Sequence, residues 1–326
     1  HQTGQFTMTE LCRQFDVSRP TGYAILKRYE TEGWEALAER SRSHHSHPGR
    51  TSPAIEEALL QERNRHSRWG ARKLLVLSLI HIWSTDFKGK FRMGNQEYCN
   101  PLTIADSKSR YLFAIHGLQY CRAEDCKPIF EKVFREYGLP EAMHSDNGPP
   151  FGSSNSLRRL TSLAVWFMDL GILPVYSDPG HPEQNGRHER MHRDLKAEAT
   201  RPPARTWIGQ QRKFDAFRKE YNEIRPHEAL GMKTPNSVHK PSKREYPRRV
   251  QDWSYPVEYK QKMVTVNGAL RWNKDGLIMV SMALAGRYVG LEPVDDAVWI
   301  VYYRHVPLGI LDERMKRVYE LGEYRI

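Results

Sequence analysis

Residues 180–196 read Gly-His-Pro-Glu-Gln-Asn-Gly-Arg-His-Glu-Arg-Met-His-Arg-Asp-Leu-Lys, and the rest of the chain can be interpreted outward from this stretch. It begins with glycine, proline and an Asn-Gly pair, which are turn-forming residues. The pattern then becomes helical, because Met191 and Leu195 are four residues apart on one face. Glu189 is therefore expected in the first turn of a basic helix. Such a carboxylate is either a favourable charge at the positive helix end or a metal ligand directed at a phosphate.

Two further carboxylates occupy informative positions. Residues 76–91 contain an apolar run ending in Trp-Ser-Thr-Asp-Phe, which places Asp86 inside an expected strand. Residues 139–151 contain Met-His-Ser-Asp-Asn-Gly-Pro-Pro-Phe, which places Asp146 where a strand gives way to a turn. Each is unremarkable alone, because aspartate is common at strand ends. Together with Glu189 they make an oxygen-only donor set of the kind that hard Mg²⁺ or Mn²⁺ ions prefer.

Three motifs around these carboxylates carry a family resemblance. They are Trp-x-x-Asp-Phe-Lys-Gly at 83–89, His-Ser-Asp-Asn-Gly-x-x-Phe at 144–151 and Gln-Asn-Gly-x-x-Glu-Arg at 184–190. In this order they resemble the DDE signature of integrase-like insertion-sequence transposases. The resemblance covers roughly residues 6–40 and 83–312. The interval from Asp146 to Glu189 is longer than in retroviral integrases, which indicates a short insertion around 153–169.

The resemblance implies phosphoryl transfer at DNA ends. Asp86, Asp146 and Glu189 would be the catalytic residues and would hold two Mg²⁺ or Mn²⁺ ions, with Asp86 bridging both. One ion would lower the pKa of a water molecule or a 3′-hydroxyl, and the other would stabilise the leaving oxygen. No covalent protein intermediate is needed.

The segment around Glu189 also carries the expected DNA contacts of the core. Polar residues just before it are expected to position the scissile phosphate or the target strand: His181, Gln184 and Asn185. Basic residues beside and after it are expected to neutralise DNA phosphates: Arg187, Arg190, Arg193 and Lys196. An ordinary solvated helix charge is the alternative for each basic residue. His144 is interpreted as structural.

The composition favours a polyanionic partner. The 326 residues predict two or three domains. Lysine and arginine number 50 against 39 acidic residues, which gives a net charge of +11. Between residues 187 and 249 there are 17 basic residues against 8 acidic ones, so most of the excess lies there. Binding to DNA is the favoured explanation, and a merely soluble basic protein is the alternative.

Cysteine spacing and hydropathy limit the kinds of site and the cellular location that the sequence allows. The four cysteines, Cys12, Cys99, Cys121 and Cys126, show no CxxC spacing, which argues against a zinc site or a disulfide framework. The sequence has no signal peptide and no apolar run approaching the roughly 18 residues of a membrane helix. A bacterial cytoplasmic, nucleoid-associated protein without a membrane partner or small-molecule substrate is expected. Because the sequence starts at His1, the natural N-terminus is expected to be missing.

Residues 1–40 are expected to form a helix-turn-helix DNA-binding domain. Thr9 is expected to cap the first helix, Val17 to be the buried residue of the turn, and Ser18 to cap the second helix. In this motif the second helix enters the major groove, and its N-terminal residues contact base edges. The expected DNA contacts are Arg19, Thr21 and Tyr23, with Lys27 and Arg28 exposed further along. A helical hairpin used only for packing is the alternative.

Residues 41–75 are expected to be a linker and part of a second helical DNA-binding segment. Similar transposases carry a longer helical segment before the first catalytic strand. Here the helix expected to start at residues 69–74 leads directly into Leu-Ser-Leu-Ile-His-Ile at 77–82. That hexapeptide also resembles the translation of a transposon end used as a sequencing adapter. We interpret the join as a deletion or a chimeric record, with a natural short strand at 75–82 as the alternative.

Residues 76–240 are expected to form an α/β catalytic core, because strands come first and then alternate with helices. The resemblance names this the ribonuclease-H-like fold. The expected strands are 82–91, 100–105, 111–118, 142–145 and 172–176. The expected helices are 125–137, 157–170, 189–198 and 210–224.

Residues 241–326 are expected to be a basic linker and a small β-barrel. Asn-Gly at 267–268 predicts a hairpin between strands at 263–266 and 269–272. Further strands are expected at 277–280, 287–291, 298–303 and 307–311. A surface with basic and aromatic residues is expected to contact DNA: Arg271, Trp272, Lys274, Arg287 and Tyr288. A barrel that contacts only protein is the alternative.

The resemblance also implies partners: double-stranded DNA of the element ends and the target, and further copies of the chain acting on paired ends. Two other functions stay open. A decayed transposase would act only as a sequence-specific DNA-binding protein, and the three intact carboxylates argue against it. A ribonuclease H-type nuclease would cut hybrids, and the two flanking DNA-binding modules argue against it.

Overall fold

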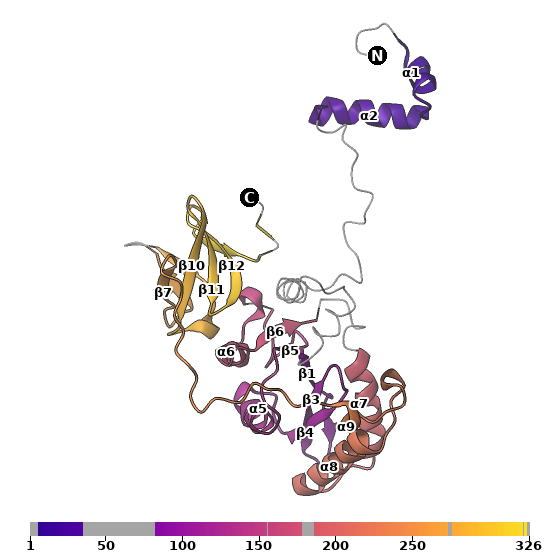
Figure 1. Ribbon diagram of the computed structural model, residues 1–326, viewed down its shortest axis with the longest axis vertical. Coiled ribbons are helices and arrows are strands. Elements are labelled where there is room, and N and C mark those ends of the chain that lie inside the picture. The colour runs from indigo at the N-terminus through magenta and orange to yellow at the C-terminus, as the bar shows by residue number, and fades with distance from the viewer. Residues whose placement is uncertain are drawn as a thin grey trace. The chain divides into compact units, whose positions relative to one another are not determined.

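The computed structural model describes residues 6–34, 82–154, 156–177, 186–272, 276–321 and 323–324. The chain divides into two units, His1–Arg50 and Thr51–Ile326, each of which is described by itself (Figure 1). The expected linker, the helix at 69–74 and the join at 77–82, apart from Ile82, lie outside the described residues.

The first unit contains two helices joined by a short turn, as the sequence predicts. Helix α1 spans Met8–Gln14 and α2 spans Arg19–Glu32. Ser18 caps α2 as expected, since its hydroxyl accepts from the Thr21 N–H at 3.3 Å. The predicted cap Thr9 is wrong: Thr7 caps α1, because it forms a reciprocal capping box with Glu10.

The two helices approach closely at one glycine. A Cβ atom on Gly22 would lie 2.5 Å from Cys12 Sγ and 3.0 Å from Met8 Sδ. Met8 and Cys12 are the buried residues of α1. Val17 is only half-buried, so the turn has a more open packing than predicted.

The second unit begins with a mixed sheet. Its strands are β1 Ile82–Phe87, β2 Phe91–Arg92, β3 Tyr98–Asp106, β4 Leu112–Leu118, β5 Ala142–Ser145 and β6 Leu173–Tyr176. The order β4-β3-β1-β5-β6 is antiparallel on the β3 side of β1 and parallel on the β5 side, and β2 pairs with the start of β3. This is the expected ribonuclease-H-like arrangement. The strand predicted at 82–91 is interrupted, because Gly89 takes a φ of +72°.

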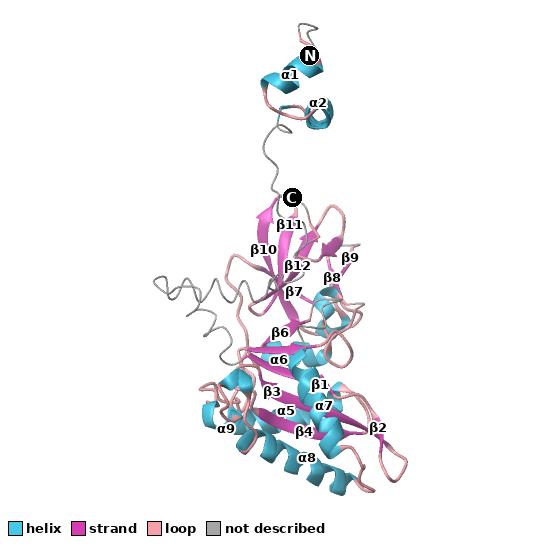
Figure 2. Ribbon diagram, turned by 90° about the vertical axis from the view of Figure 1, so that its right-hand side faces the viewer, coloured by secondary structure: helices cyan, strands magenta, loops and turns pink. Residues whose placement is uncertain are grey.

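Helices cover both faces of this sheet (Figure 2). Helices α5 Ala123–Tyr137 and α6 Ser162–Asp169 pack on one face, around Trp83, Phe113 and Phe130. Helices α7 Gly186–Ala199 and α8 Trp207–Glu223 pack on the other, with Met191, Leu195 and Phe214 buried. The short elements η4 Glu228–Leu230 and α9 Pro235–Val238 follow.

Helix α6 starts later than the predicted 157–170. A single 3-10 turn, η2 Leu157–Arg159, comes first, and Arg158 and Arg159 both take left-handed backbone angles, φ 48° and 55°. Thr161 then caps α6 by accepting from the Ala164 N–H at 3.2 Å. The left-handed pair therefore prevents one continuous helix.

The last part of the second unit is the C-terminal sheet domain, residues 255–324. It contains β7 Lys260–Met263, β8 Ala269–Arg271, β9 Leu277–Met279, η5 Met282–Leu284, β10 Tyr288–Asp295, β11 Val298–Tyr303, β12 Val306–Asp312 and β13 Arg317–Tyr319. Strands β13-β12-β11-β10-β7 form one sheet and β8-β9 a second. The sheets are not closed into a ring within the described residues, so the small barrel stays a prediction.

The predicted hairpin at Asn267-Gly268 needs correction. The turn is present, with the Gly268 N–H donating to Thr265 O at 2.9 Å and the Thr265 N–H donating to Ala269 O at 2.8 Å, but the pairing beyond it is limited to the bridge between Val264 and Leu270. Strand β7 lies earlier than expected and pairs with β10 instead. The sequence also gave no prediction of β13.

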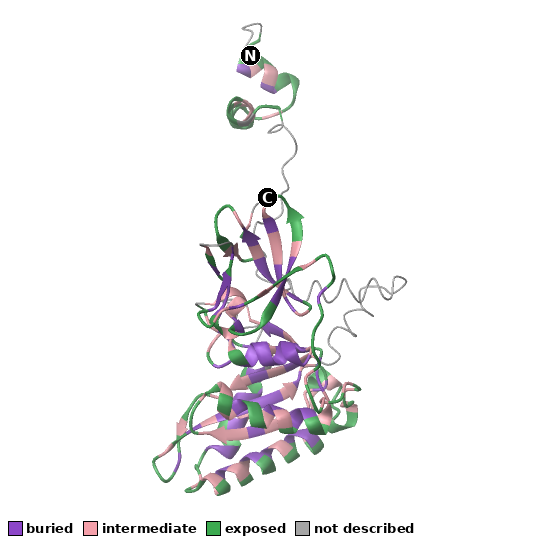
Figure 3. Cartoon of the chain, turned by 90° about the vertical axis from the view of Figure 1, so that its left-hand side faces the viewer, coloured by how far each residue is buried: buried purple, intermediate pink, exposed green. Residues whose placement is uncertain are grey.

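Helix α6 packs between the two parts of the second unit. Leu163 and Phe167 face the core, whereas Ala164, Val165 and Met168 join the buried cluster of the C-terminal sheet domain. Its residues from Leu163 to Asp169 are all buried, which makes it stand out in Figure 3. Among the described residues, no helix combines the length and apolar character needed to cross a membrane.

Candidate active site

Asp86 and Asp146 come from neighbouring parallel strands. The register pairs Ser84 with His144, and each aspartate lies two residues further along the chain, Asp86 within β1 and Asp146 directly after β5. Side chains two residues apart point to the same side of a sheet. The two aspartates are therefore at the carboxyl edge of the core sheet, which is where open α/β sheets bind their ligands.

The Asp86 side chain is 14% exposed and faces α7. Its Oδ2 lies 3.8 Å from His192 Nδ1. The Thr103 hydroxyl donates to Asp86 O at 2.9 Å and lies 2.9 Å from His192 Nε2. Thr103 therefore fixes both the backbone of Asp86 and the ring beside it.

Asp146 is the first residue after β5. Its Oδ1 accepts from the Gly148 N–H at 3.3 Å. The residue as a whole is exposed, yet desolvation by the surrounding chain raises the pKa of its carboxyl above the ordinary range. The nearby Cys121 responds to this charge: burial raises the pKa of its thiol, and Asp125 and Asp146 raise it further.

Glu189 lies in the first turn of α7, as expected, and is exposed. Its neighbours His188 and His192 are buried, with ring centroids 5.4 Å apart. Burial lowers the pKa of each imidazole to about 3, so both rings are neutral at physiological pH. His188 Nε2 is buried and has no hydrogen-bond partner among the described residues.

A positive region lies beside Asp86. Burial lowers the pKa of Lys88, and the charge of Lys196 lowers it further while Asp86 raises it. Arg190 and Lys196 are exposed on α7, as predicted. His181, Gln184 and Asn185 lie outside the described residues, as does the side chain of Arg187.

The carboxylates are not gathered into a metal-binding cluster. In the part of the chain that the structure describes, no three His, Cys, Asp or Glu side chains lie close enough together to hold a metal ion. The donor chemistry of Asp86, Asp146 and Glu189 nevertheless suits a hard divalent cation. Their role as a metal site stays a prediction.

The residues predicted to read DNA from α2 are at its surface. Arg19, Thr21 and Tyr23 are exposed, and so is Lys27. Arg28 is half-buried, so its predicted exposure is only partly correct. Their contacts with DNA stay a prediction.

The DNA-binding surface predicted for the C-terminal sheet domain is partly wrong. Trp272 is only 2% exposed, because its ring packs beneath Lys260 Nζ, 4.6 Å from the centroid, and against Trp299. Arg287 is paired with Asp169 at 2.9 Å. Arg271 and Tyr288 are exposed, whereas Lys274 lies outside the described residues.

Several residues around the site were not predicted. Thr103 and His192 hold Asp86, and Arg159 contacts Asn147, which follows Asp146. His144, predicted to be structural, lies 3.2 Å from the Ser177 hydroxyl. These partners are 12 to 89 residues apart in sequence, and the only local signal is the neighbouring aspartate.

Known proteins match most of this chain. Two Integrase core domain models match residues 79–182 and 170–235, and a Homeodomain-like domain model matches residues 21–77. A 31.7 kDa protein of insertion element IS407 from Burkholderia multivorans is 29% identical over 223 residues, which cover 64% of this chain and 75% of that protein. An insertion element IS136 protein from Agrobacterium fabrum is 32% identical over 193 residues, which cover 55% of this chain and 93% of that protein.

Among solved structures, the HTLV-2 integrase catalytic core domain in complex with magnesium matches with 14% identity and a TM-score of 0.38. That match covers 49% of this chain and 96% of the viral domain.

Proposed function

We propose that this chain, which belongs to the integrase-like insertion-sequence transposases, cuts DNA at the ends of a mobile element and joins those ends to a target. One relationship supports the proposal above all: β1 and β5 are parallel neighbours, and an aspartate stands at the carboxyl edge of each. Helix α7, whose His192 lies 3.8 Å from Asp86, carries Glu189 in its first turn.

Asp86, Asp146 and Glu189 would hold Mg²⁺ or Mn²⁺, two ions per site, and the bound ions would supply Lewis acidity toward the phosphate and its nucleophile. Because the three carboxylates are not gathered among the described residues, their approach on ion binding is part of the proposal. Thr103 and the neutral His192 would keep Asp86 oriented. Lys88 and Lys196 would attract the DNA phosphates.

The remaining DNA contacts are proposed from the same resemblance. Helix α2 would read element ends through Arg19, Thr21 and Tyr23, with Lys27 and Arg28 nearby. His181, Gln184, Asn185, Arg187 and Arg190 would contact the DNA at the catalytic edge. Further copies of the chain would act together on paired ends, in the bacterial cytoplasm.

Strand transfer from labelled element ends into a supercoiled plasmid tests the proposal. Wild-type protein should form products with Mg²⁺ or Mn²⁺, whereas Asp86→Asn, Asp146→Asn and Glu189→Gln should form none and still bind the ends. Wild-type rates in any of the three variants would exclude this site.

A second function would apply if the three carboxylates, which are not gathered among the described residues, also stay apart in the presence of divalent ions. The chain would then be a sequence-specific DNA-binding protein without catalysis. Wild-type protein that binds element ends tightly and forms no transfer product with either ion would favour this second function.

A further inference from the structure

Residues 156–160, here named the arginine segment, lie in the stretch between β5 and α6. Its central residues Arg158 and Arg159 both have left-handed backbone angles, φ 48° and 55°. Residues with a Cβ seldom adopt this conformation, and it persists only where surrounding contacts hold it in place. The contacts that hold these two arginines come from different parts of the molecule.

Arg159 contacts the loop that follows Asp146. Its guanidinium donates to Asn147 Oδ1 and, at 3.4 Å, to Ser177 O. Asn147 Nδ2 donates to the same Ser177 carbonyl at 2.7 Å. Asn147 directly follows Asp146 in the chain, so Arg159 holds the residue next to Asp146 in place.

The backbone of Arg159 is held by the same loop. The Ser153 N–H donates to Arg159 O at 3.1 Å, and the Tyr176 hydroxyl donates to Arg159 O at 3.4 Å. The Tyr176 hydroxyl also lies 3.3 Å from Phe151 O, at the far end of the loop. Arg159 and Tyr176 thus anchor both ends of residues 147–151.

Arg158 contacts the C-terminal sheet domain instead. Its guanidinium donates to Pro307 O at 2.6 Å, and its backbone N–H donates to Glu320 Oε1 at 3.1 Å. The adjacent Leu157 packs against the buried cluster of that domain, and the Ser156 and Ser281 hydroxyls lie 2.8 Å apart. Arg159 is therefore fixed to the loop after Asp146, and Arg158 is fixed to the C-terminal sheet domain.

We propose that the arginine segment couples docking of the C-terminal sheet domain to the position of Asp146. Arg159 is a positioning residue that acts through Asn147, and Arg158 connects it to the domain. Two consecutive residues in a restricted backbone conformation cannot shift independently, so loss of the Pro307 and Glu320 contacts releases the Asn147 contact as well. This inference rests on the proposed function only where it concerns catalysis.

Hydrogen–deuterium exchange of the full chain tests the coupling without any activity. The Phe151 and Gly152 N–H groups both donate to Gly148 O, at 3.1 and 3.0 Å, and report on the loop. Arg158→Ala should raise their exchange rate about as much as Arg159→Ala does, several-fold, while exchange in α5 stays at the wild-type rate. Glu320→Ala removes one acceptor from the other side and should give the same change in smaller degree.

Arg314→Ala is the matched control. Arg314 also lies in the C-terminal sheet domain, but its guanidinium pairs with the exposed Asp296. It should leave the exchange of residues 147–152 unchanged. Wild-type exchange of this loop in Arg158→Ala, alongside faster exchange in Arg159→Ala, would overturn the coupling.

Strand transfer gives the second measurement. Arg159→Ala should reduce the rate about tenfold or more with end binding unchanged, and Arg159→Lys, which keeps a donor, should recover much of it. Arg158→Ala combined with Arg159→Ala should lose no more than the worse single variant, because both act through one contact. Additive losses would overturn the shared route. Inactive wild-type protein would contradict the proposed function, and the exchange result would still decide the coupling.

Discussion

Arg304 of the C-terminal sheet domain donates from Nε to Oδ1 of Asp169, the last residue of α6, at 3.0 Å. The Tyr303 hydroxyl donates to the same oxygen at 2.6 Å, and Arg287 lies 2.9 Å from Oδ2. The Asp169 side chain is 4% exposed. A buried carboxylate is tolerated only when it is paired and hydrogen-bonded. Arg304, Tyr303 and Arg287 of the C-terminal sheet domain together supply these contacts to the Asp169 carboxylate of the core.

Removing this acid should destabilise the second unit. Asp169→Ala leaves the nearly buried Arg304 guanidinium without its partner, and breaking a buried pair in this way costs about 3–5 kcal/mol. The free energy of unfolding from urea titrations measures the loss. The matched control is Asp296→Ala, whose carboxylate is 90% exposed and pairs with Arg314; it should change stability by less than about 1 kcal/mol. Equal losses in both variants would contradict the importance of burial.

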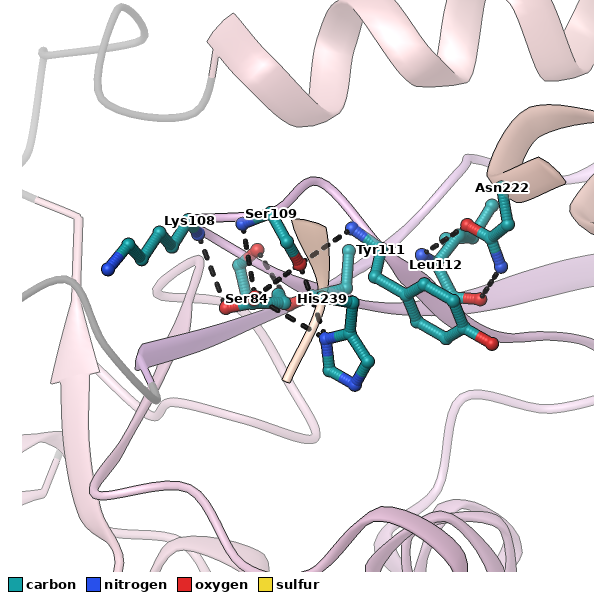
Figure 4. Close-up of polar contacts among 9 residues, drawn as sticks. Ser84, Lys108, Ser109, Tyr111, Leu112, Asn222 and His239 are labelled. Carbon is teal, nitrogen blue, oxygen red and sulfur yellow. Dashed lines mark hydrogen bonds and ion pairs between the residues drawn. The ribbon is translucent and has the colours of Figure 1, made fainter. Parts of the chain in front are cut away.

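Asn222 of α8 completes the edge of β4. Its Oδ1 accepts from the Leu112 N–H at 2.8 Å, and its Nδ2 donates to Leu112 O at 2.9 Å (Figure 4). Asn222→Ala should lower the free energy of unfolding by about 2–3 kcal/mol, because two buried backbone groups lose their partners. Thermal or urea unfolding measures this loss. Asn236→Ala, at an exposed position of α9, is the control and should be close to neutral.

Asp106 should make the fold sensitive to acid. Burial alone would raise the pKa of its carboxyl, but hydrogen bonds from His239, from Ser109 and from the Lys108 N–H outweigh burial and lower it. A lowered folded-state pKa stabilises the protein above the unfolded value of about 3.9. That stabilisation is lost as the pH falls through the folded-state pKa.

Urea titrations at pH values from about 2.5 to about 7, in steps of about half a pH unit, measure this effect. Asp106→Asn should be less stable than wild type at pH 7, and its stability should fall less steeply below about pH 4. Asp252→Asn, at an exposed position, controls for the change in net charge. An acid limb as steep in Asp106→Asn as in wild type would assign the sensitivity to other groups.

Divalent ions should stabilise the second unit if the proposed site is correct. At ten times the dissociation constant, an ion that binds only folded protein adds about 1.4 kcal/mol. Mg²⁺ or Mn²⁺ should therefore raise the melting temperature of wild type and not that of Asp86→Asn or Asp146→Asn. Chelation with EDTA should reverse the shift. A shift of equal size in all three proteins would place ion binding elsewhere.

Packing between the two helices of the first unit should shape the α2 surface that is proposed to read DNA. Gly22→Val would place side-chain atoms where Cys12 and Met8 already lie, and overpacking of this kind costs about 1–3 kcal/mol. End binding should weaken at least as much as in Tyr23→Ala. Ala24→Val, at an exposed position of α2, should bind like wild type. Binding by Gly22→Val at wild-type affinity would contradict this packing role.

The sequence predicted those elements whose signal is local. Strands β5 and β11 have the predicted bounds, Ala142–Ser145 and Val298–Tyr303, because short apolar runs end at turn residues there. The amphipathic α5 and the basic α7 followed from helical spacing. The order of the three carboxylates along strand, strand end and helix was also predicted correctly.

Features that depend on distant residues were not predictable. The left-handed turn at Arg158 is held by Pro307, 149 residues away, whereas the apolar pattern beginning at Leu157 predicts a helix there. Strand β7 pairs with β10 rather than across the nearby Asn-Gly turn. Trp272 is buried by Lys260 and Trp299. Around Asp86, the roles of Thr103 and His192 depend on contacts that sequence spacing does not encode.

From Leu163 to Asp169, every residue of helix α6 is buried. Leu163 and Phe167 belong to the core cluster, and Ala164, Val165 and Met168 belong to the cluster of the C-terminal sheet domain. A chain cut before that domain would therefore expose Ala164, Val165 and Met168 to water. Such a fragment would aggregate or bind other hydrophobic surfaces. The core and the C-terminal sheet domain therefore have to fold as one cooperative unit, because neither of them buries α6 alone.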